Sequence, residues 1–216
     1  MIPHSRPTEK RTLAVAALGA LAATSASAAI VYSGTVNLTA SDTIFFDLAQ
    51  TGTTPIENAS TIPVPNTNFM LMSAPSSAVI ITALSPEAGV AGGSYTVPGY
   101  APIPWASNLP FATTVDSTAT FTAGQILLDP ILGGWPIESG HGYLGLQLGS
   151  HYGWAQVSYT STPSGNSLTL HDFAYEDTAN TPIQAGAIPE PSTYAALTGL
   201  LAGSAALYAR RRKRAA

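Results

Sequence analysis

Two runs of alternating apolar residues, Tyr143-Leu-Gly-Leu-Gln-Leu148 and Gly153-Trp-Ala-Gln-Val-Ser-Tyr159, decide the fold class of this chain. Successive side chains of a β-strand point to opposite faces, so the three leucines of the first run fall on one face. In the second run, alanine, valine and tyrosine share one face, while tryptophan, glutamine and serine share the other. Because only residues 149–152 separate the runs, we expect them to pair as an antiparallel hairpin.

The same pattern of short apolar runs separated by Gly, Pro, Ser, Thr and Asn extends from residue 30 to residue 185. Two proline-rich segments, 49–68 and 97–111, are expected to be loops or sheet edges. The absence of an internal repeat argues against a propeller or solenoid. The sequence therefore predicts an all-β domain, an antiparallel two-sheet sandwich or jelly roll, flanked by an N-terminal signal helix and a C-terminal transmembrane helix. The expected strands are 30–39, 43–48, 69–73, 78–84, 94–97, 119–128, 143–148, 153–160 and 168–175.

The distribution of charge restricts the function. No Lys or Arg occurs from Thr12 to Ala209, whereas residues 30–188 contain ten Asp and Glu, a formal charge of −10. Nucleic acid is therefore not an expected partner, since no cations replace the counterions of the phosphates. Enzymes that bind nucleotide phosphates through Lys or Arg are disfavoured for the same reason. The chain has no cysteine, which excludes disulfides and thiol chemistry.

Residues 1–29 have the composition of a secretory signal peptide. Arg6, Lys10 and Arg11 precede an apolar stretch, residues 13–23. Ala26-Ser27-Ala28 then supplies the small-x-small pattern of a cleavage site, and Ser27-Ala28-Ala29 is a one-residue alternative. We expect this segment to engage the Sec translocon and signal peptidase.

Residues 187–216 form a second targeting region behind the domain 30–186. Residues 192–209 carry no formal charge and would span about 27 Å as a helix, within the range of transmembrane helices. Lys and Arg beside a membrane helix stay on the cytoplasmic side, so both basic ends are expected inside and the domain outside the inner membrane. The basic residues behind the helix are Arg210, Arg211, Arg212, Lys213 and Arg214.

Pro189-Glu190-Pro191, the short apolar helix and the terminal basic cluster together resemble the PEP-CTERM sorting signal of exported bacterial proteins. The resemblance covers roughly the last 28 residues. It implies that an exosortase, a membrane protease of Gram-negative bacteria that make exopolysaccharide, processes the chain near the motif. Prolines block helix and sheet, so such a motif presents an extended segment to a protease.

A second resemblance lies upstream, in residues 151–159, 168–176 and 182–186. A "YGW" strand followed by a "DFAYE" strand is similar to the end of a recurring group of these exported domains. The similarity implies a shared β-rich domain and brings no established activity with it.

Candidate chemistry is sparse. A glycosidase needs two carboxylates about 5–10 Å apart, and Asp172 with Glu176, or Asp129 with Glu138, are the candidate pairs. The histidines lack the spacing of a zinc site, and solvated side chains are the plainer interpretation. Calcium would offset the negative charge, although no EF-hand loop is present. The histidines are His141, His151 and His171, and the candidate calcium ligands are Asp172, Glu176 and Asp177.

Four aromatic residues lie in or beside Pro- or Gly-rich loops: Tyr100, Trp105, Phe111 and Trp135. Sugar rings stack on flat aromatic faces, so Tyr100, Trp105 and Trp135 are candidate contacts for a polysaccharide. The alternative is that these rings cap the end of the core.

Together these features predict an exported, non-enzymatic protein of the cell envelope or extracellular matrix, associated with exopolysaccharide or biofilm. A carbohydrate-binding module is the first alternative, and a secreted glycoside hydrolase is the second. No cofactor is expected beyond the candidate calcium ion.

Overall fold

The computed structural model describes residues 29–49, 55–57, 67–73, 79–96, 98–128, 133–135, 141–162 and 165–189. The predicted signal peptide up to residue 28, and the predicted transmembrane helix and basic tail, lie outside these residues. Within the described part, no helix has the length and apolar character needed to cross a membrane.

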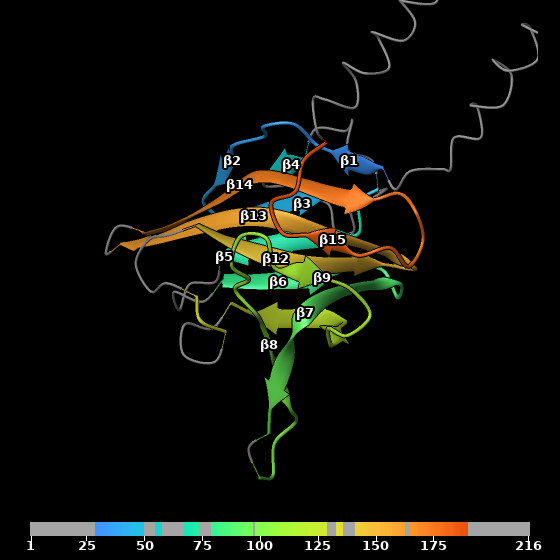
Figure 1. Cartoon of the computed structure of the whole chain (residues 1–216). Coiled ribbons are helices and arrows are strands. Elements are labelled where there is room, and N and C mark those ends of the chain that lie inside the picture. Colours follow the sequence, from blue (N-terminus) through green and yellow to red (C-terminus); the bar gives the residue numbers. More distant parts are fainter. Residues whose placement is uncertain are drawn as a thin grey trace, which may run out of the picture.

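All regular structure in the described residues is β, which confirms the all-β part of the predicted fold class (Figure 1). The first strands are β1 (Ile30–Tyr32), β2 (Leu38–Ala40), β3 (Thr43–Phe46), β4 (Ile56–Glu57), β5 (Phe69–Ser73), β6 (Val79–Ala83), β7 (Ala88–Tyr95) and β8 (Ile103–Ala106). The remaining strands are β9 (Thr114–Val115), β10 (Phe121–Thr122), β11 (Gly124–Leu127), β12 (His141–Leu148), β13 (His151–Thr162), β14 (Gly165–Glu176) and β15 (Ile183–Gln184).

The predicted central hairpin is formed by β12 and β13, which pair antiparallel. Leu148 is the direct partner of His151, so the turn consists of Gly149 and Ser150 alone and is tighter than expected. Gly149 has a φ of 58°, a conformation that glycine adopts without steric cost. The faces are as predicted, because the leucines of β12 pack in the core while Trp154 of β13 lies in a separate cluster on the opposite face.

Thirteen of the described strands form one continuous mixed sheet, which replaces the expected pair of antiparallel sheets. Its order is β1-β14-β13-β12-β7-β8-β11-β6-β5-β3-β4, with β2 paired to β14 and β10 to β7. The β8–β11 pair is parallel, and the other pairs along this order are antiparallel.

β7 joins the two halves of this sheet because it changes partner along its length. Its first residues, Ala88 to Val90, pair with β12, whereas Gly92 to Tyr95 pair with β8. A Cβ on Gly92 would lie 1.9 Å from the carbonyl oxygen of Trp105, so only glycine permits the approach of β8.

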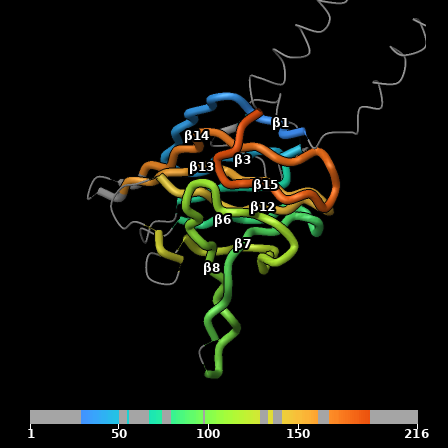
Figure 2. Tube along the Cα trace, in the orientation of Figure 1, coloured from blue at the N-terminus to red at the C-terminus, as the bar shows by residue number. Residues whose placement is uncertain are grey.

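The sheet curls so that its two halves enclose one core, a half-barrel (Figure 2). Phe46 of β3 and Phe69 of β5 come from one half, and Phe173 of β14 from the other. The ring of Phe46 lies 5.4 Å from that of Phe69 and 5.2 Å from that of Phe173, measured between centroids. The Phe46 ring therefore links the two halves directly.

Several strand boundaries differ from the sequence prediction. The expected strand 30–39 is divided into β1 and β2 around Gly34 and Asn37, which have φ of 74° and 47°. The segment 97–111, expected to be a loop or sheet edge, contains β8, which lies between β7 and β11 inside the sheet. The segment 49–68 contains β4, which lies at the edge of the sheet as expected. Most of β7 was missed because its sequence, AGVAGGSY, is rich in glycine and lacks alternation.

A small second layer covers the outer face of the sheet. β15 pairs with β9, with Ile183 opposite Val115. Both residues are buried with Trp154 and Tyr152 of β13 in a cluster separate from the main core. This layer gives β13 buried side chains on both faces.

Candidate functional site

The β7–β8 hairpin, here called the arm (residues 92–106), projects from the body of the sheet (Figure 1). It contains no charged residue, and its connection carries Pro98 and Pro102. Tyr95, Tyr100 and Ile103 are 52%, 74% and 42% exposed. Three of the large exposed hydrophobic side chains of the described residues thus lie on this one element.

One face of the arm is aromatic and apolar. Gly93 pairs with Trp105 and Tyr95 with Ile103, so these four residues lie on the same face at two-residue spacing. A Cβ on Gly93 would lie 2.6 Å from Cζ2 of Trp105, which means that the indole covers the glycine. Such a flat, uncharged face suits the ring of a sugar or another apolar planar surface.

The predicted sugar contacts separate into two groups. Tyr100 is exposed near the tip of the arm, and Trp105 is half-buried against Gly93. Trp135 is instead 2% exposed and belongs to the main core, where its Nε1–H donates to the carbonyl of Ala106 at 2.8 Å. The ring of Trp135 is therefore not an exposed stacking platform, which corrects its proposed role.

Tyr95 belongs to the arm but was not identified from the sequence. The pattern that would have identified it is Gly93-x-Tyr95 paired opposite Ile103-x-Trp105. It is recognisable only when the two segments are known to pair, since each is too short to show a period by itself.

A polar cluster lies on the outer face of β13 and β14. A bulge between Gln156 and Val157 leaves His171 unpaired and turns both His171 and Asp172 away from the core. Nε2 of His171 lies 2.8 Å from Oγ of Ser158, and Nδ1 lies 2.9 Å from Oδ1 of Asn37. The Tyr32 hydroxyl donates to Oδ2 of Asp172 at 2.8 Å.

This cluster shifts the proton affinities of its members. Burial, followed by the hydrogen bond to Asp172, raises the pKa of Tyr32 to about 12. Burial raises the pKa of Asp172 above its ordinary 3.8, although the bond from Tyr32 opposes the shift. Oδ1 of Asp172 is buried and accepts no hydrogen bond. Burial and the neighbouring His141, whose ring centroid lies 4.5 Å away, lower the pKa of His171 from 6.5.

The lowered pKa of His171 predicts an acid-sensitive fold. The unfolded chain binds the proton more readily, so the free energy of unfolding decreases as the pH falls below 6.5 toward the lowered value. We expect the urea midpoint to fall between about pH 7 and 5 in the wild type, and to fall less in His171→Gln. For His141→Gln we expect a fall of the urea midpoint between those of the wild type and His171→Gln. This substitution removes the neighbouring imidazole, one of the two causes of the lowered pKa of His171, and leaves its burial. If the urea midpoint of His171→Gln fell with pH as much as that of the wild type, His171 would not be the cause of the acid sensitivity.

The described residues contain no group of three His, Asp or Glu side chains placed to hold a metal ion. The candidate calcium ligands are spread along the end of β14. Asp172 binds Tyr32, Glu176 is 2% exposed and accepts from the Thr178 amide at 3.0 Å, and Asp177 accepts from the Ala29 amide at 3.2 Å. These positions do not support the candidate calcium site.

The candidate glycosidase pair Asp172 and Glu176 gains no support from the geometry. Asp172 and Glu176 lie four residues apart on one strand, which corresponds to about 13 Å. That separation exceeds the distance between the two carboxylates of a glycosidase. Asp129 and Glu138 lie outside the described residues.

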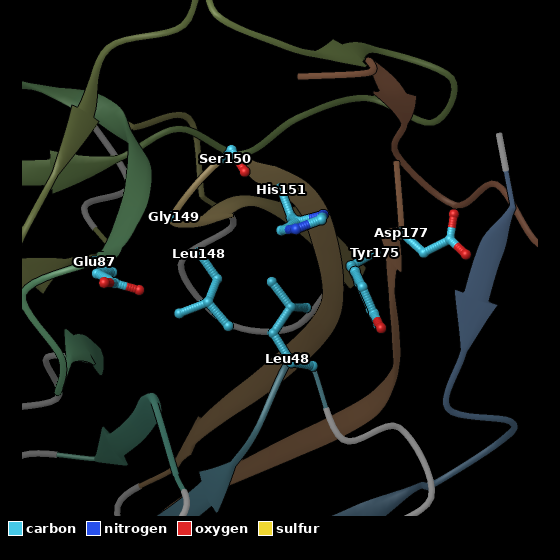
Figure 3. A pocket seen from close by; sticks show the side chains of 9 residues that line it. Leu48, Glu87, Leu148, Gly149, Ser150, His151, Tyr175 and Asp177 are labelled. Carbon is cyan, nitrogen blue, oxygen red and sulfur yellow. The ribbon is translucent and has the colours of Figure 1, made fainter. Parts of the chain in front are cut away.

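A cavity of about 410 Å³ lies beside the β12–β13 turn (Figure 3). Leu48 and Leu148 point into it, while Glu87 and Asp177 lie on opposite sides. Nδ1 of His151 lies 3.0 Å from the carbonyl oxygen of Glu176, an atom that only accepts, so Nδ1 carries the hydrogen. The cavity is acidic at its rim, apolar at its floor and without Lys or Arg.

The two ends of the domain meet at Trp154, which is 1% exposed. The ring of Tyr32, in β1, lies 6.2 Å from the indole. Nε1–H of Trp154 donates to the carbonyl of Ala187 at 3.1 Å, two residues before the predicted sorting motif. Pro189 is the last described residue of the motif, and Glu190 and Pro191 lie outside the described part.

No protein-family model matches the chain, and searches of curated proteins and of solved structures likewise give no match. The resemblance of residues 189–214 to a sorting signal therefore stays a prediction.

Proposed function

We propose that this chain is an exported, non-enzymatic protein of the cell envelope or extracellular matrix, associated with exopolysaccharide or biofilm. A PEP-CTERM signal at its C-terminal end sorts it, and an exosortase-type protease processes it. Pro189, Glu190 and Pro191 form the processing motif, and Arg210 to Arg214 hold the end of the helix in the cytoplasm.

The convergence of both domain ends on Trp154 supports this topology. If both flanking helices return to the cytoplasm, both ends of the exported domain have to face the membrane, because few residues separate the domain from either helix. Tyr32 and Ala187 contact one indole, so the segments that precede and follow the domain start close together. Domain ends on opposite sides of the molecule would have required a long additional connection.

The termini of the protein recovered from its producing cells test this proposal. Mass spectrometry should find the first residues removed and the chain cut near residues 189–191, and cells lacking the exosortase should retain the intact C-terminal segment in the inner membrane. Pro189→Ala with Pro191→Ala should block the second cut, whereas Pro182→Ala, an exposed proline outside the motif, should leave it unchanged. Recovery of the intact chain from the cytosol would reject the proposal.

The arm favours carbohydrate binding as a second function. Its exposed face carries Tyr95 and Trp105 without any charge, and Tyr100 lies near its tip. Stacking of sugar rings on such aromatic faces requires no specific charge partner, which agrees with a neutral matrix polysaccharide as the ligand.

Removing the aromatic side chains of the arm should abolish retention on the polysaccharide of the producing organism. Because each stacking ring contributes about 1 kcal/mol, we expect the triple substitution Tyr95→Ala, Tyr100→Ala and Trp105→Ala to weaken binding by roughly 100-fold. Affinity electrophoresis measures this loss. Phe111→Ala removes an aromatic side chain that is 69% exposed away from the arm and should bind normally. Equal retention of both variants would reject the arm as the binding site.

A further inference from the structure

Ala29 and Asp177 bind each other through two hydrogen bonds. The amide nitrogen of Ala29 donates to Oδ1 of Asp177 at 3.2 Å, and the amide nitrogen of Asp177 donates to the carbonyl of Ala29 at 3.1 Å. Ala29 lies one residue before β1, whose first residue, Ile30, pairs with Glu176. The two bonds thus extend the β1–β14 pairing by one position.

Both sequence candidates for signal-peptide cleavage adjoin this residue. Cleavage between Ala28 and Ala29 would convert the Ala29 amide into a free α-ammonium group, at an atom already within hydrogen-bond distance of the Asp177 carboxylate. Cleavage between Ala29 and Ile30 would remove Ala29 and with it both hydrogen bonds.

We propose that the mature protein begins at Ala29 and that its α-ammonium group forms an ion pair with the carboxylate of Asp177. This inference rests on the proposed export of the chain. It adds the cleavage position and a structural role for the new terminus.

The proposed ion pair would place a fixed positive charge in a domain whose sequence supplies no Lys or Arg. Residues 12–209 contain no Lys or Arg, so the new terminus would be the only fixed cation in a domain of formal charge −10. The facing titratable groups are Asp177, the buried Glu176 opposite Ile30, and His151 beside the carbonyl of Glu176. A charged donor also strengthens the existing contact, because hydrogen bonds from an ionised group are about twice as strong as neutral ones.

The test uses the processed protein isolated from cells that express and export the full chain. Peptide mapping by mass spectrometry identifies the first residue, which we expect to be Ala29. Acetic anhydride labelling at a series of pH values then gives the pKa of the α-amine from the acetylated fraction of the N-terminal peptide. We expect Asp177→Asn to lower that pKa by about half a unit, as an exposed ion pair predicts.

Glu87→Gln is the matched control, since Glu87 and Asp177 line the same cavity from opposite sides (Figure 3). It should leave the pKa of the α-amine close to that of the wild type. A first residue of Ile30 would overturn the proposal, and so would an α-amine pKa unaffected by Asp177→Asn. Retention of Met1 in the isolated protein would instead reject the export proposal itself, so the two failures are distinguishable.

Discussion

Replacing Trp154 with alanine is expected to lower the free energy of unfolding by about 3–5 kcal/mol, as for other fully buried large aromatic residues. The indole packs against Tyr32 and Tyr143 and binds the carbonyl of Ala187. Its loss would leave a cavity between the sheet and the segments at both ends of the domain. Urea denaturation followed by tyrosine fluorescence measures the change.

Two further variants separate packing at Trp154 from its hydrogen bond. Trp154→Phe keeps most of the apolar ring but leaves the Ala187 carbonyl without its donor, so a smaller loss of about 1–3 kcal/mol is expected. Trp105→Ala removes the same side-chain type from the arm, outside the main core, and should change stability less than Trp154→Ala. A loss below about 1 kcal/mol for Trp154→Ala would contradict the role of this residue as the meeting point of the domain ends.

Phe46→Ala is expected to destabilise the fold by a similar amount, about 3–5 kcal/mol. Phe46 is 1% exposed, stacks on Phe69 of its own half of the sheet and packs at a tilt against Phe173 of the other half. Removing the ring leaves a cavity at the contact that holds the curled sheet closed. The loss should therefore include faster hydrogen exchange in β3 and β14, which face each other there.

The exposed ring of Tyr100 provides the comparison for Phe46. Tyr100 is 74% exposed, so Tyr100→Ala should change the free energy of unfolding by less than about 0.5 kcal/mol. If both substitutions had equally small effects, the two halves of the sheet would not depend on Phe46 for their contact. The half-barrel would then be stabilised elsewhere.

The all-β class and the central hairpin could be predicted because both depend on neighbouring residues. Alternation in 143–148 and 153–159 determines which side chains share a face, whichever strand pairs with them. β7 was largely missed because five of its eight residues are Gly or Ala and its sequence shows no alternation. Its place in the sheet depends on Gly92, which allows β8 to approach, and on the pairing of Val90 with Leu146 of β12, a residue far along the chain.

The candidate site was predicted only in part for the same reason. Tyr100 and Trp105 were identified as loop aromatics, and the structure places both on the arm. Trp135 has the same local sequence character, with glycine and proline beside it, yet it is buried under a hydrogen bond to Ala106. Tyr95 was missed because its partner, Ile103, lies beyond a proline-rich connection.

The acidic residues near the end of β14 show that closeness in the sequence does not predict a shared binding site. Asp172, Glu176 and Asp177 are close along the chain, but they bind Tyr32, the Thr178 amide and the Ala29 amide. An extended strand separates residues four positions apart by about 13 Å, so neighbours in sequence become distant in space.

By itself, the sequence determined the β class, the faces of the central hairpin and the confinement of Lys and Arg to the two ends, because periodicity and charge are properties of the chain before it folds. Only the tertiary structure decided how the sheet curls, which aromatic side chains stay exposed and that Ala29 meets Asp177. These features depend on contacts between residues more than a hundred positions apart in some cases, such as Phe46 with Phe173, and no local pattern records them.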